Sequence, residues 1–463
     1  MEKAFAEWPR SLWAENSLTW DFPEFDLSYS FDVVIVGAGY SGLWTAHHLA
    51  TLNPGLSVAI VDARQPGFGA SGRNGGWCSA FSPMSLEAVA TQSNKQGAID
   101  LQNALVASVD EIGAYVASSG IDCGWHKGGT LSFASSQLQL QGIKETIEMS
   151  RDFGYDDSFM TYLSSEQAEG RVRIRGSHGA SYSPHCAALH PAQLVDGLVN
   201  QLLTRNVQFF GSTQVTEINP HQITANTSKG TVLIDAKWIV RATEGFTARM
   251  KQYRRDVAPL YSYMIATEPL SDAQWQYIGW TNRETVSDGR NLVIYVQRTA
   301  DGRIAFGGRG APYKFASRIG SRFDNNPRIH SLIETSMREM FPSIDDVAVT
   351  HRWGGALGVH RDWFASVNVN HKDNIATLGG YVGDGVAFSY VAAKEVARNI
   401  VGERHDARPL PIVNHVSPRW EPEPFRYVGI NSILRLTERA DESEKRTGRK
   451  NRFVNWLLGK LIP

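Results

Sequence analysis

The residues with the clearest chemical potential are three glycines followed by one carboxylate. Gly37, Gly39 and Gly42 fit the pattern G-x-G-x-x-G, and Asp62 stands 20 positions after the last glycine. Such glycines allow a tight turn, a close approach of a pyrophosphate, and close packing of a helix on a strand, while the carboxylate accepts hydrogen bonds from a ribose. A carboxylate there repels the 2′-phosphate of NADP and disfavours that cofactor. Because Arg64 is nearby, NADP remains an alternative. The alternative is a glycine turn that only permits packing.

Two later glycine segments help to tell FAD from NAD. Residues 71–76 read SGRNGG, a loop that can offer a guanidinium and backbone amides to a pyrophosphate or a flavin ring. Residues 379–385 read GGYVGDG and precede a helical pattern, so a helix N-terminus can face the negative charge of a reduced flavin. Nicotinamide needs no such feature. The combination favours FAD, and a surface Ω-loop is the alternative for residues 71–76.

The elements that must position these segments begin with a βαβ unit. Residues 32–36 (DVVIV) predict a buried strand, 41–52 a helix with His47 and His48 on its surface, and 56–61 (LSVAIV) a second strand. Further helices are expected over 86–120, 191–203, 327–340 and 387–400, and strands over 125–134, 180–189, 207–218, 236–240, 257–310 and 375–378. This order predicts an α/β fold, in which a Rossmann-like FAD-binding domain is interleaved with a smaller α+β substrate domain containing an antiparallel sheet.

The expected domain organisation follows the same pattern. An N-terminal arm occupies 1–30, the discontinuous FAD-binding domain 31–85, 186–250 and 345–405, the substrate domain 86–185 and 251–344, and a Pro-rich strap with a basic C-terminal helix 406–463.

Composition excludes several classes of function. The 463 residues carry a net charge of -1, which gives no general attraction to nucleic acid. Cys78, Cys123 and Cys186 are spaced neither as a disulfide framework nor as a zinc site, so no metal and a reducing, cytoplasmic compartment are expected. No window is apolar enough for a membrane span, although the basic tail 444–463 could touch a membrane or, as favoured, dock on the body. The oligomeric state stays open.

Several segments in order resemble one known family. They are DVVIVGAGYSGLWTAHHLA, GASGRNGGW, HPAQLVDGLVNQLLTRNVQFF, IVRATEG and GGYVGDGVAFSYVAAKEVARNI, within about residues 31–405. Together they resemble the FAD-dependent amine oxidoreductases of the D-amino-acid oxidase and glycine oxidase superfamily, and GASGRNGG most resembles the gamma-glutamylputrescine oxidase branch.

The resemblance assigns roles to residues of this sequence. It implies that Asp62 binds the adenosine ribose, that Val215 faces the adenine, and that Gly383 approaches the pyrimidine edge of the flavin. Sarcosine-oxidase relatives link the flavin to a cysteine near the C-terminus. This sequence has no cysteine from residue 300 onward, so FAD is expected to bind noncovalently. The expected cofactor residues are Gly37, Gly39, Tyr40, Ser41, Gly42, Asp62, Ala63, Ser71, Arg73, Asn74, Gly75, Gly76, Val215, Gly380, Gly383, Asp384, Gly385 and Val386.

The sequence departs from the family pattern at two places. Arg241 and Glu244 stand in IVRATEG, where relatives more often carry a neutral segment of the ATNG type. Val359, His360 and Arg361 replace a threonine and an acidic pair before a proline. The contacts close to the substrate are therefore not transferred from the family.

The implied activity is oxidation of a small amine: a polyamine derivative, an amino acid or an aminophosphonate. Hydride passes from the amine to flavin N5, water hydrolyses the imine to an aldehyde or keto acid, and oxygen takes the electrons. Alternatives are a dehydrogenase that reduces a quinone and a flavin-binding sensor or assembly protein without turnover. Candidates for the substrate pocket, each with ordinary core or surface packing as the alternative, are Trp77, Tyr261, Tyr263, Tyr295, Arg298, Arg309, His351, Trp353 and His360.

Overall fold

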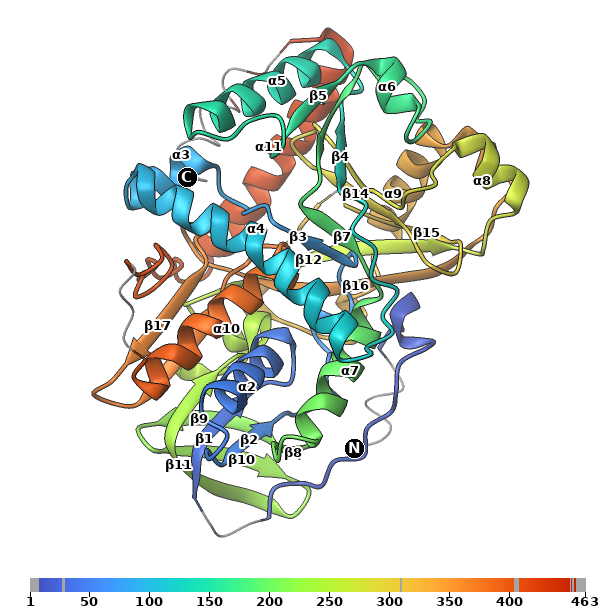
Figure 1. The fold of residues 1–463 in the computed structure, drawn as a ribbon. Coiled ribbons are helices and arrows are strands. Elements are labelled where there is room, and N and C mark those ends of the chain that lie inside the picture. The colour runs from blue at the N-terminus through green and yellow to red at the C-terminus, as the bar shows by residue number, and fades with distance from the viewer. Residues whose placement is uncertain are drawn as a thin grey trace.

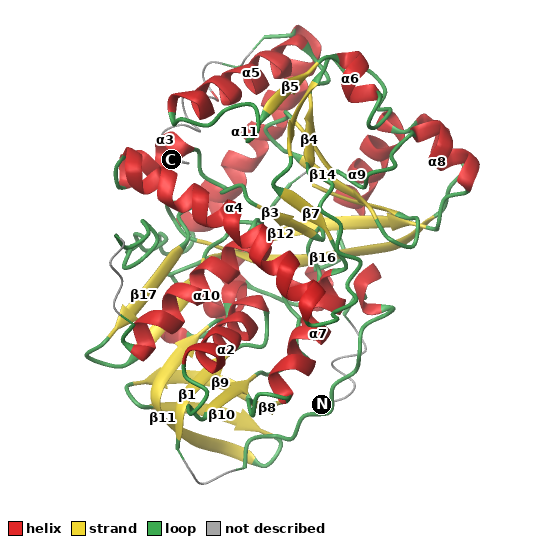
Figure 2. Cartoon of the chain, in the orientation of Figure 1, coloured by secondary structure: helices red, strands yellow, loops and turns green. Residues whose placement is uncertain are grey.

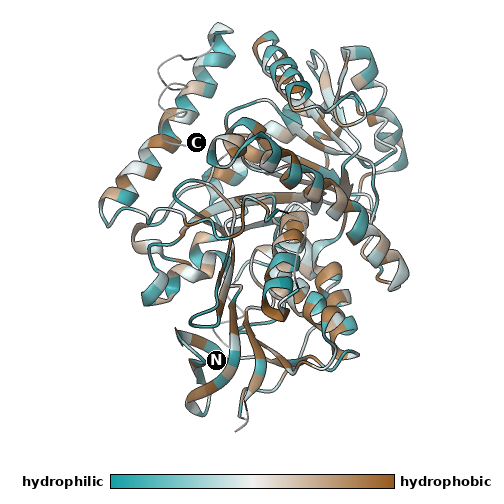
Figure 3. Cartoon of the chain, turned by 60° about the vertical axis from the view of Figure 1, so that its left-hand side comes forward, coloured by the Kyte–Doolittle hydropathy of each residue, from teal (hydrophilic) through white to brown (hydrophobic). Residues whose placement is uncertain are grey.

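Two eight-stranded sheets form the framework of the protein. A computed structural model describes residues 8–26, 30–308, 310–403, 408–449, 451 and 454 (Figure 1). One sheet lies in the lower half of the view and the other in the upper half, with helices packed around both (Figure 2). Hydrophobic residues gather in the strands and on inner helix faces, and hydrophilic residues on the outer helices (Figure 3).

The first sheet is mainly parallel, as the βαβ pattern predicts. Its central strands are β1 (Phe31–Val36), β2 (Val58–Val61) and β11 (Gly230–Arg241). β1 lies between the other two and pairs with each of them in parallel. On one side β8 (Gln208–Phe210) pairs with β2. On the other side β18 (Ile375–Gly379) pairs with β11, and β17 (Ser366–Asn370) pairs with β18. An antiparallel flap is added by β10 (Gln222–Thr227), which pairs with β11, and by β9 (Gln214–Asn219), which pairs with β10. The carboxyl ends of β1, β2, β11 and β18 therefore meet at one edge.

Four helices pack in two layers over one face of this sheet. They are α2 (Tyr40–Leu52), α4 (Lys95–Ser118), α7 (Pro191–Leu203) and α10 (Gly385–Val401). The expectation that His47 and His48 lie on a helix surface is wrong, because α4 and α10 cover that face of α2. Tyr115 of α4 and Tyr390 of α10 pack edge-on against the two imidazoles at ring-centroid distances of 4.5 and 4.7 Å. A lone helix pattern cannot reveal a second covering layer.

The second sheet is mostly antiparallel. Its order is β16 (Val349–Val359), β12 (Ala258–Thr267), β15 (Ile304–Gly308), β14 (Ile294–Arg298), β13 (Thr285–Asp288), β4 (Thr130–Phe133), β6 (Ala180–Ser183) and β5 (Thr161–Leu163). β13 and β4 form its one parallel pair among the described strands. β16 pairs with β12 whereas β17 belongs to the first sheet, so the chain crosses between sheets after Val359. A small antiparallel pair, β3 (Trp77–Ser79) and β7 (Cys186–Ala188), also forms.

The remaining helices flank the second sheet or close the chain. They are α3 (Leu86–Gln92), α5 (Gln137–Asp152), α6 (Ser165–Glu169), α8 (Asp272–Ile278), α9 (Pro327–Met340) and α11 (Phe425–Thr447). α11 follows the Pro-rich strap directly, while residues 450, 452, 453 and 455–463 of the expected basic helix lie outside the described residues. Among the described residues no helix is long and apolar enough to span a membrane. The α/β fold class agrees with the prediction; the division into domains stays a prediction.

The contact between α2 and β1 gives a stability prediction. A Cβ at Gly42 would lie 1.9 Å from the Gly37 carbonyl oxygen, so Gly42→Ala must push the helix away and should lower the free energy of unfolding by about 1–3 kcal/mol. Gly142→Ala, in α5 with no atom within 4 Å of the added Cβ, should instead raise it by about 0.5–1 kcal/mol. Urea denaturation followed by circular dichroism measures both changes. Equal midpoints for the two variants would contradict this packing.

Candidate functional site

A long cavity follows the carboxyl edge of the first sheet and ends against β16. Its volume is about 340 Å³. The lining residues predicted from the sequence are Gly37, Gly39, Tyr40, Ser41, Asp62, Ala63, Ser71, Asn74, Val215, Gly383, Gly385 and Val386. The structure thus brings together, in one cavity, segments that are far apart in the chain.

The G-x-G-x-x-G turn forms the narrow floor of this cavity. Gly37 has φ +112°, a conformation that other residues rarely adopt, and a Cβ there would lie 2.4 Å from the Ala242 carbonyl oxygen. A Cβ at Gly39 would lie 2.9 Å from the Ser71 Oγ. Gly39 is also the N-cap of α2, so the helix directs its free N–H groups and partial positive charge at the cavity. This end suits a pyrophosphate.

Asp62 ends β2 beside that turn. Its two carboxylate oxygens accept hydrogen bonds from the backbone N–H groups of Ala38 and Arg64, at 2.7 and 2.8 Å. Desolvation raises the pKa of the Asp62 carboxyl to about 6, against the lowering effect of these bonds. Val215 on β9 lines the cavity beyond it. The carboxylate retains further acceptor sites of the kind that ribose hydroxyls need, and its binding of a ribose stays a prediction.

The loop 67–77 forms the wall opposite the turn and is held from outside. Four consecutive backbone carbonyls, of residues 72–75, accept hydrogen bonds: from Ser11 Oγ (2.9 Å), Trp353 Nε1 (2.9 Å), Trp13 Nε1 (2.8 Å) and Gln297 Nε2 (2.8 Å). Ser11 and Trp13 belong to the N-terminal arm, and the other donors to the second sheet. The N-terminal arm therefore holds the loop 67–77 in place, a role that its irregular sequence does not predict.

Within this loop the side chains divide. Ser71 Oγ accepts a hydrogen bond from the Tyr40 N–H of α2 at 2.9 Å, and Asn74 lines the cavity. Arg73 instead points out of the cavity lining and pairs with Asp324, 3.1 Å away and nearly inaccessible to solvent. Gly75 and Gly76 also lie outside the lining, because Tyr295 and Gln297 occupy the space beside them.

The N-terminus of α10 closes the far end. Gly383 has φ +110°, and an added Cβ would find no atom nearer than Leu357 Cδ1 at 4.0 Å, so its backbone faces open cavity space. Asp384 is the N-cap and makes no capping hydrogen bond, and desolvation raises the pKa of its carboxyl to about 7. Gly380 and Asp384 themselves lie outside the lining, since the His360 ring crowds Gly380 at 2.4 Å from an added Cβ.

Two of the substrate-pocket candidates meet beside the loop. The rings of Trp77 and Tyr295 pack edge-on with centroids 6.4 Å apart. The Tyr295 ring also touches Gly75, where an added Cβ would lie 2.9 Å from Cδ2, and its hydroxyl bonds to Ser262 on β12. These aromatic side chains thus stand next to the cofactor cavity without lining it.

The other candidates are dispersed. Tyr261 and Tyr263 lie in the core under α9, where Tyr261 Oη accepts from the Gly320 N–H and Tyr263 Oη donates to the Phe323 carbonyl. Arg298 stacks on Trp275 at 4.1 Å. None of these lines the cavity.

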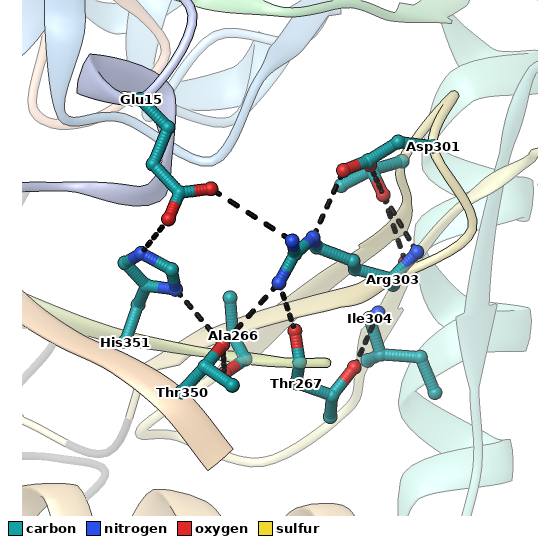
Figure 4. A network of polar contacts seen from close by, with 9 residues as sticks. Glu15, Ala266, Thr267, Asp301, Arg303, Ile304, Thr350 and His351 are labelled. Carbon is teal, nitrogen blue, oxygen red and sulfur yellow. Dashed lines mark hydrogen bonds and ion pairs between the residues drawn. The ribbon is translucent and has the colours of Figure 1, made fainter. Parts of the chain in front are cut away.

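His351 belongs to a polar network that anchors the arm (Figure 4). Its Nε2 lies 2.9 Å from a Glu15 carboxylate oxygen, and Arg303 faces the other oxygen at 3.8 Å. Trp353 packs against Trp13, and His360 shares a hydrogen bond with the Phe364 carbonyl. Arg309 lies outside the described residues.

Several lining residues are not among the cofactor residues predicted from the sequence. They are Val36, Val61, Arg64, Gly67, Phe68, Gly69, Ala70, Thr213, Gln214, Thr216, Ala242, Thr243, Glu244, Gly245, Phe246, Arg249, Met250, Lys251, Ala356, Leu357, Tyr381 and Ser389. Residues 242–245 follow the carboxyl end of β11, the strand that pairs with β1. Ligands bind at the carboxyl ends of parallel strands, so this position in the sequence could have identified these residues as part of the site.

Two of the residues that depart from the family pattern, Glu244 and Arg241, behave differently from each other. Glu244 lines the cavity with φ +42°, accepts a hydrogen bond from the Gly358 N–H, and has a carboxyl pKa that desolvation raises to about 7. Arg241 faces away and pairs with Asp256 at 3.2 Å. A negative charge at Glu244 therefore depends on pH near neutrality.

The cysteines lie away from this cavity. The three cysteines are free and buried, and none lines the cavity. In the described part of the chain no cluster of His, Cys, Asp or Glu could hold a metal ion.

Comparison with known proteins agrees with this geometry. The family model described as "FAD dependent oxidoreductase" (DAO) matches residues 32–399. Gamma-glutamylputrescine oxidoreductase of Escherichia coli is 27% identical over 395 residues, covering 83% of this chain and 88% of that protein. A probable oxidoreductase, OrdL, of Rhizobium meliloti is 26% identical over 387 residues, covering 82% and 86%. Glycine oxidase of Geobacillus kaustophilus superposes with a TM-score of 0.68 at 19% identity, covering 84% and 100%.

The residues of the cavity fit FAD. The α2 N-terminus and Gly39 suit its pyrophosphate, Asp62 its ribose, and the open backbone at Gly383 a flat ring. No cysteine lines the cavity among the described residues, and noncovalent attachment of FAD stays a prediction.

Asp62 makes FAD affinity depend on pH. Protonation removes acceptor sites from its carboxyl, so the dissociation constant of FAD should rise as the pH falls through about 6. Asp62→Asn should remove this step, and Asp62→Ala should weaken FAD at least tenfold, about 1.4 kcal/mol, at pH 8. Titration of apoprotein by flavin fluorescence between pH 5 and 8 measures both, with Asp235→Ala, on an exposed position of β11, as control. A pH step that survives in Asp62→Asn would assign it to another group.

Proposed function

Because the chain belongs to the DAO family of FAD-dependent oxidoreductases, we propose that it oxidises a small amine, with oxygen as the electron acceptor. Bound FAD supplies N5 as the acceptor for the hydride that leaves the α-carbon of the amine, and water hydrolyses the imine product to an aldehyde or keto acid. The substrate class comprises primary and secondary amines, including polyamine derivatives, amino acids and aminophosphonates.

One observation carries the proposal: a single cavity joins the dinucleotide turn, Asp62, the loop 67–77 and the α10 N-terminus. Asp62 and Val215 would hold the adenosine half of the cofactor, and Ala356 and Gly383 would lie at its ring end. That end lies where the two sheets meet, because Ala356 belongs to β16 of the second sheet.

The protein has three tasks in this reaction. The clamped loop holds Ser71 and Asn74 in the cavity wall, the α10 N-terminus faces the ring end, and the aromatic pair Trp77 and Tyr295 excludes water beside the loop. An amine that binds in its neutral form requires no protein base. Raised carboxyl pKa values at Glu244 and Asp384 limit the negative charge near the ring at neutral pH.

The names of similar proteins support an amine as substrate. Gamma-glutamylputrescine oxidoreductase, glycine oxidase and iminodiacetate oxidase of Chelativorans sp. BNC1 are all named for compounds with an amino or imino nitrogen. Alternatives are a quinone as acceptor and a flavin protein without turnover.

An anaerobic flavin spectrum tests the proposal. Adding a panel of amines that contains gamma-glutamylputrescine, glycine and iminodiacetate should abolish the flavin absorbance with at least one member, because a bound amine transfers two electrons. Admission of air should restore the absorbance and consume oxygen. Restoration only by a quinone would assign a dehydrogenase, and an unchanged spectrum across a broad panel would favour the protein without turnover.

The aromatic pair gives a matched set of variants. Tyr295→Ala should slow anaerobic flavin reduction about tenfold, because water enters beside the loop, while Tyr295→Phe keeps the ring and should stay within about threefold of wild type. Stopped-flow absorbance measures the rates, and bound FAD is quantified for each variant. Tyr277→Ala, an exposed residue of α8, is the control. Equal loss in the Ala and Phe variants would assign the role to the hydroxyl.

A further inference from the structure

A second concave pocket, of about 390 Å³, lies beside the cofactor cavity and is strongly cationic. Five basic side chains line it: Arg249, Lys251, Arg254, Arg318 and Arg322. They come from two segments, 248–254 after β11 and 316–323 before α9. No acidic residue is among its lining residues.

These five cations have no acidic partner within the described part of the chain. Arg249 donates to the Ile319 carbonyl at 2.9 Å, Arg254 donates to the Ala316 carbonyl at 3.3 Å, and Arg322 stacks on Phe323 at 4.6 Å. Such contacts orient guanidinium groups but do not neutralise them. By contrast, the nearby Arg241 and Arg73 are each paired with an aspartate.

The pocket wall is locally strained and firmly held. Ala316 and Ser317 are consecutive non-glycine residues with φ +62° and +55°. Hydrogen bonds fix this turn, since Glu423 accepts from the Ala316 N–H and Tyr313 Oη from the Ser317 N–H. Strained backbone of this kind persists where the surroundings enforce it and is concentrated at binding sites.

The pocket and the cofactor cavity are neighbouring spaces that share part of their lining. Arg249 and Lys251 line both spaces, whereas Arg254, Arg318 and Arg322 line only the pocket. The dinucleotide pyrophosphate has its own place at Gly39 and the α2 N-terminus. Desolvation lowers the pKa of the Arg249 guanidinium, so a charge partner at this point would relieve an unfavourable burial.

We propose that this pocket is a second binding site, which takes a small polyanion bearing phosphate groups. Guanidinium groups bind phosphate oxygens through paired, charge-assisted hydrogen bonds, and four of the five cations are arginines. A concave pocket fits a compact ligand better than the flat surface of an acidic protein. The site is independent of the amine substrate and does not require turnover.

Calorimetry on the FAD-loaded protein tests the site, with inorganic tripolyphosphate as the probe. Saturable binding with one ligand per chain is expected at low salt. Arg318→Ala/Arg322→Ala should weaken it at least tenfold without affecting the fold, because both side chains are exposed. The matched control is Arg435→Ala/Arg439→Ala, two exposed arginines of α11 that carry the same charge change.

Each outcome decides the proposal. Binding that the pocket variant loses and the control keeps supports the site. Absence of saturable heat, or equal binding by both double variants, overturns it. Binding only to protein stripped of FAD, abolished by added FAD, assigns the probe to the pyrophosphate end and also overturns it. Binding of polyglutamate but not of tripolyphosphate indicates an acidic protein surface as the partner and contradicts a small-anion pocket. The flavin absorbance of each variant is recorded in parallel, so that a loss of FAD can be told apart from a loss of the polyanion site.

Discussion

The four hydrogen bonds to the backbone carbonyls of residues 72–75 are the constraint on which the site depends. A loop so rich in glycine has many accessible conformations, and the hydrogen bonds that the Arg73 and Asn74 side chains make to its own backbone do not tie it to the rest of the protein. The donors are Ser11 and Trp13 of the arm and Gln297 and Trp353 of the second sheet. Because these donors fix the loop from its outer side, its inner side stays free to form a cavity wall. The first sheet provides the cofactor turn, but the second sheet and the arm complete the cavity.

Electrostatic balance around the cavity is the second consequence of this architecture. Asp62 and Glu244 line the cavity, Asp384 caps α10 just outside the lining, and desolvation raises the carboxyl pKa of each. Two basic side chains, Arg249 and Lys251, also line the cavity, and Arg249 lies in the same short 3-10 helix as Glu244. An anionic cofactor thus meets carboxyls that are partly protonated near neutral pH and cations that are not neutralised by neighbours. The cations of Arg249 and Lys251 line both this cavity and the cationic pocket, and so connect the two spaces.

Local patterns predicted the parts of the fold that depend on neighbours in sequence. The helix expected over 191–203 is α7 (Pro191–Leu203), and the strand–glycine–helix unit begins as expected. Alternation on β12 indicated that Tyr261 and Tyr263 share a face, but not which face; the intervening Ser262 is the residue that meets Tyr295. Choosing between faces requires the tertiary arrangement of both sheets. The arm was equally unpredictable, because its contacts follow no helical or strand period.

The network that holds the arm also constrains the order in which the chain can mature. Glu15 leaves the ribosome early, yet Arg303 and His351, the residues that face its carboxylate, belong to the second half of the sequence. Domains tend to fold as they emerge, so the first sheet's initial βαβ unit can begin to assemble while the arm is still without a docking place. Closure of the loop 67–77 therefore belongs to the last stage of folding. A nascent chain keeps its future cofactor cavity open on one side until most of it has been synthesised.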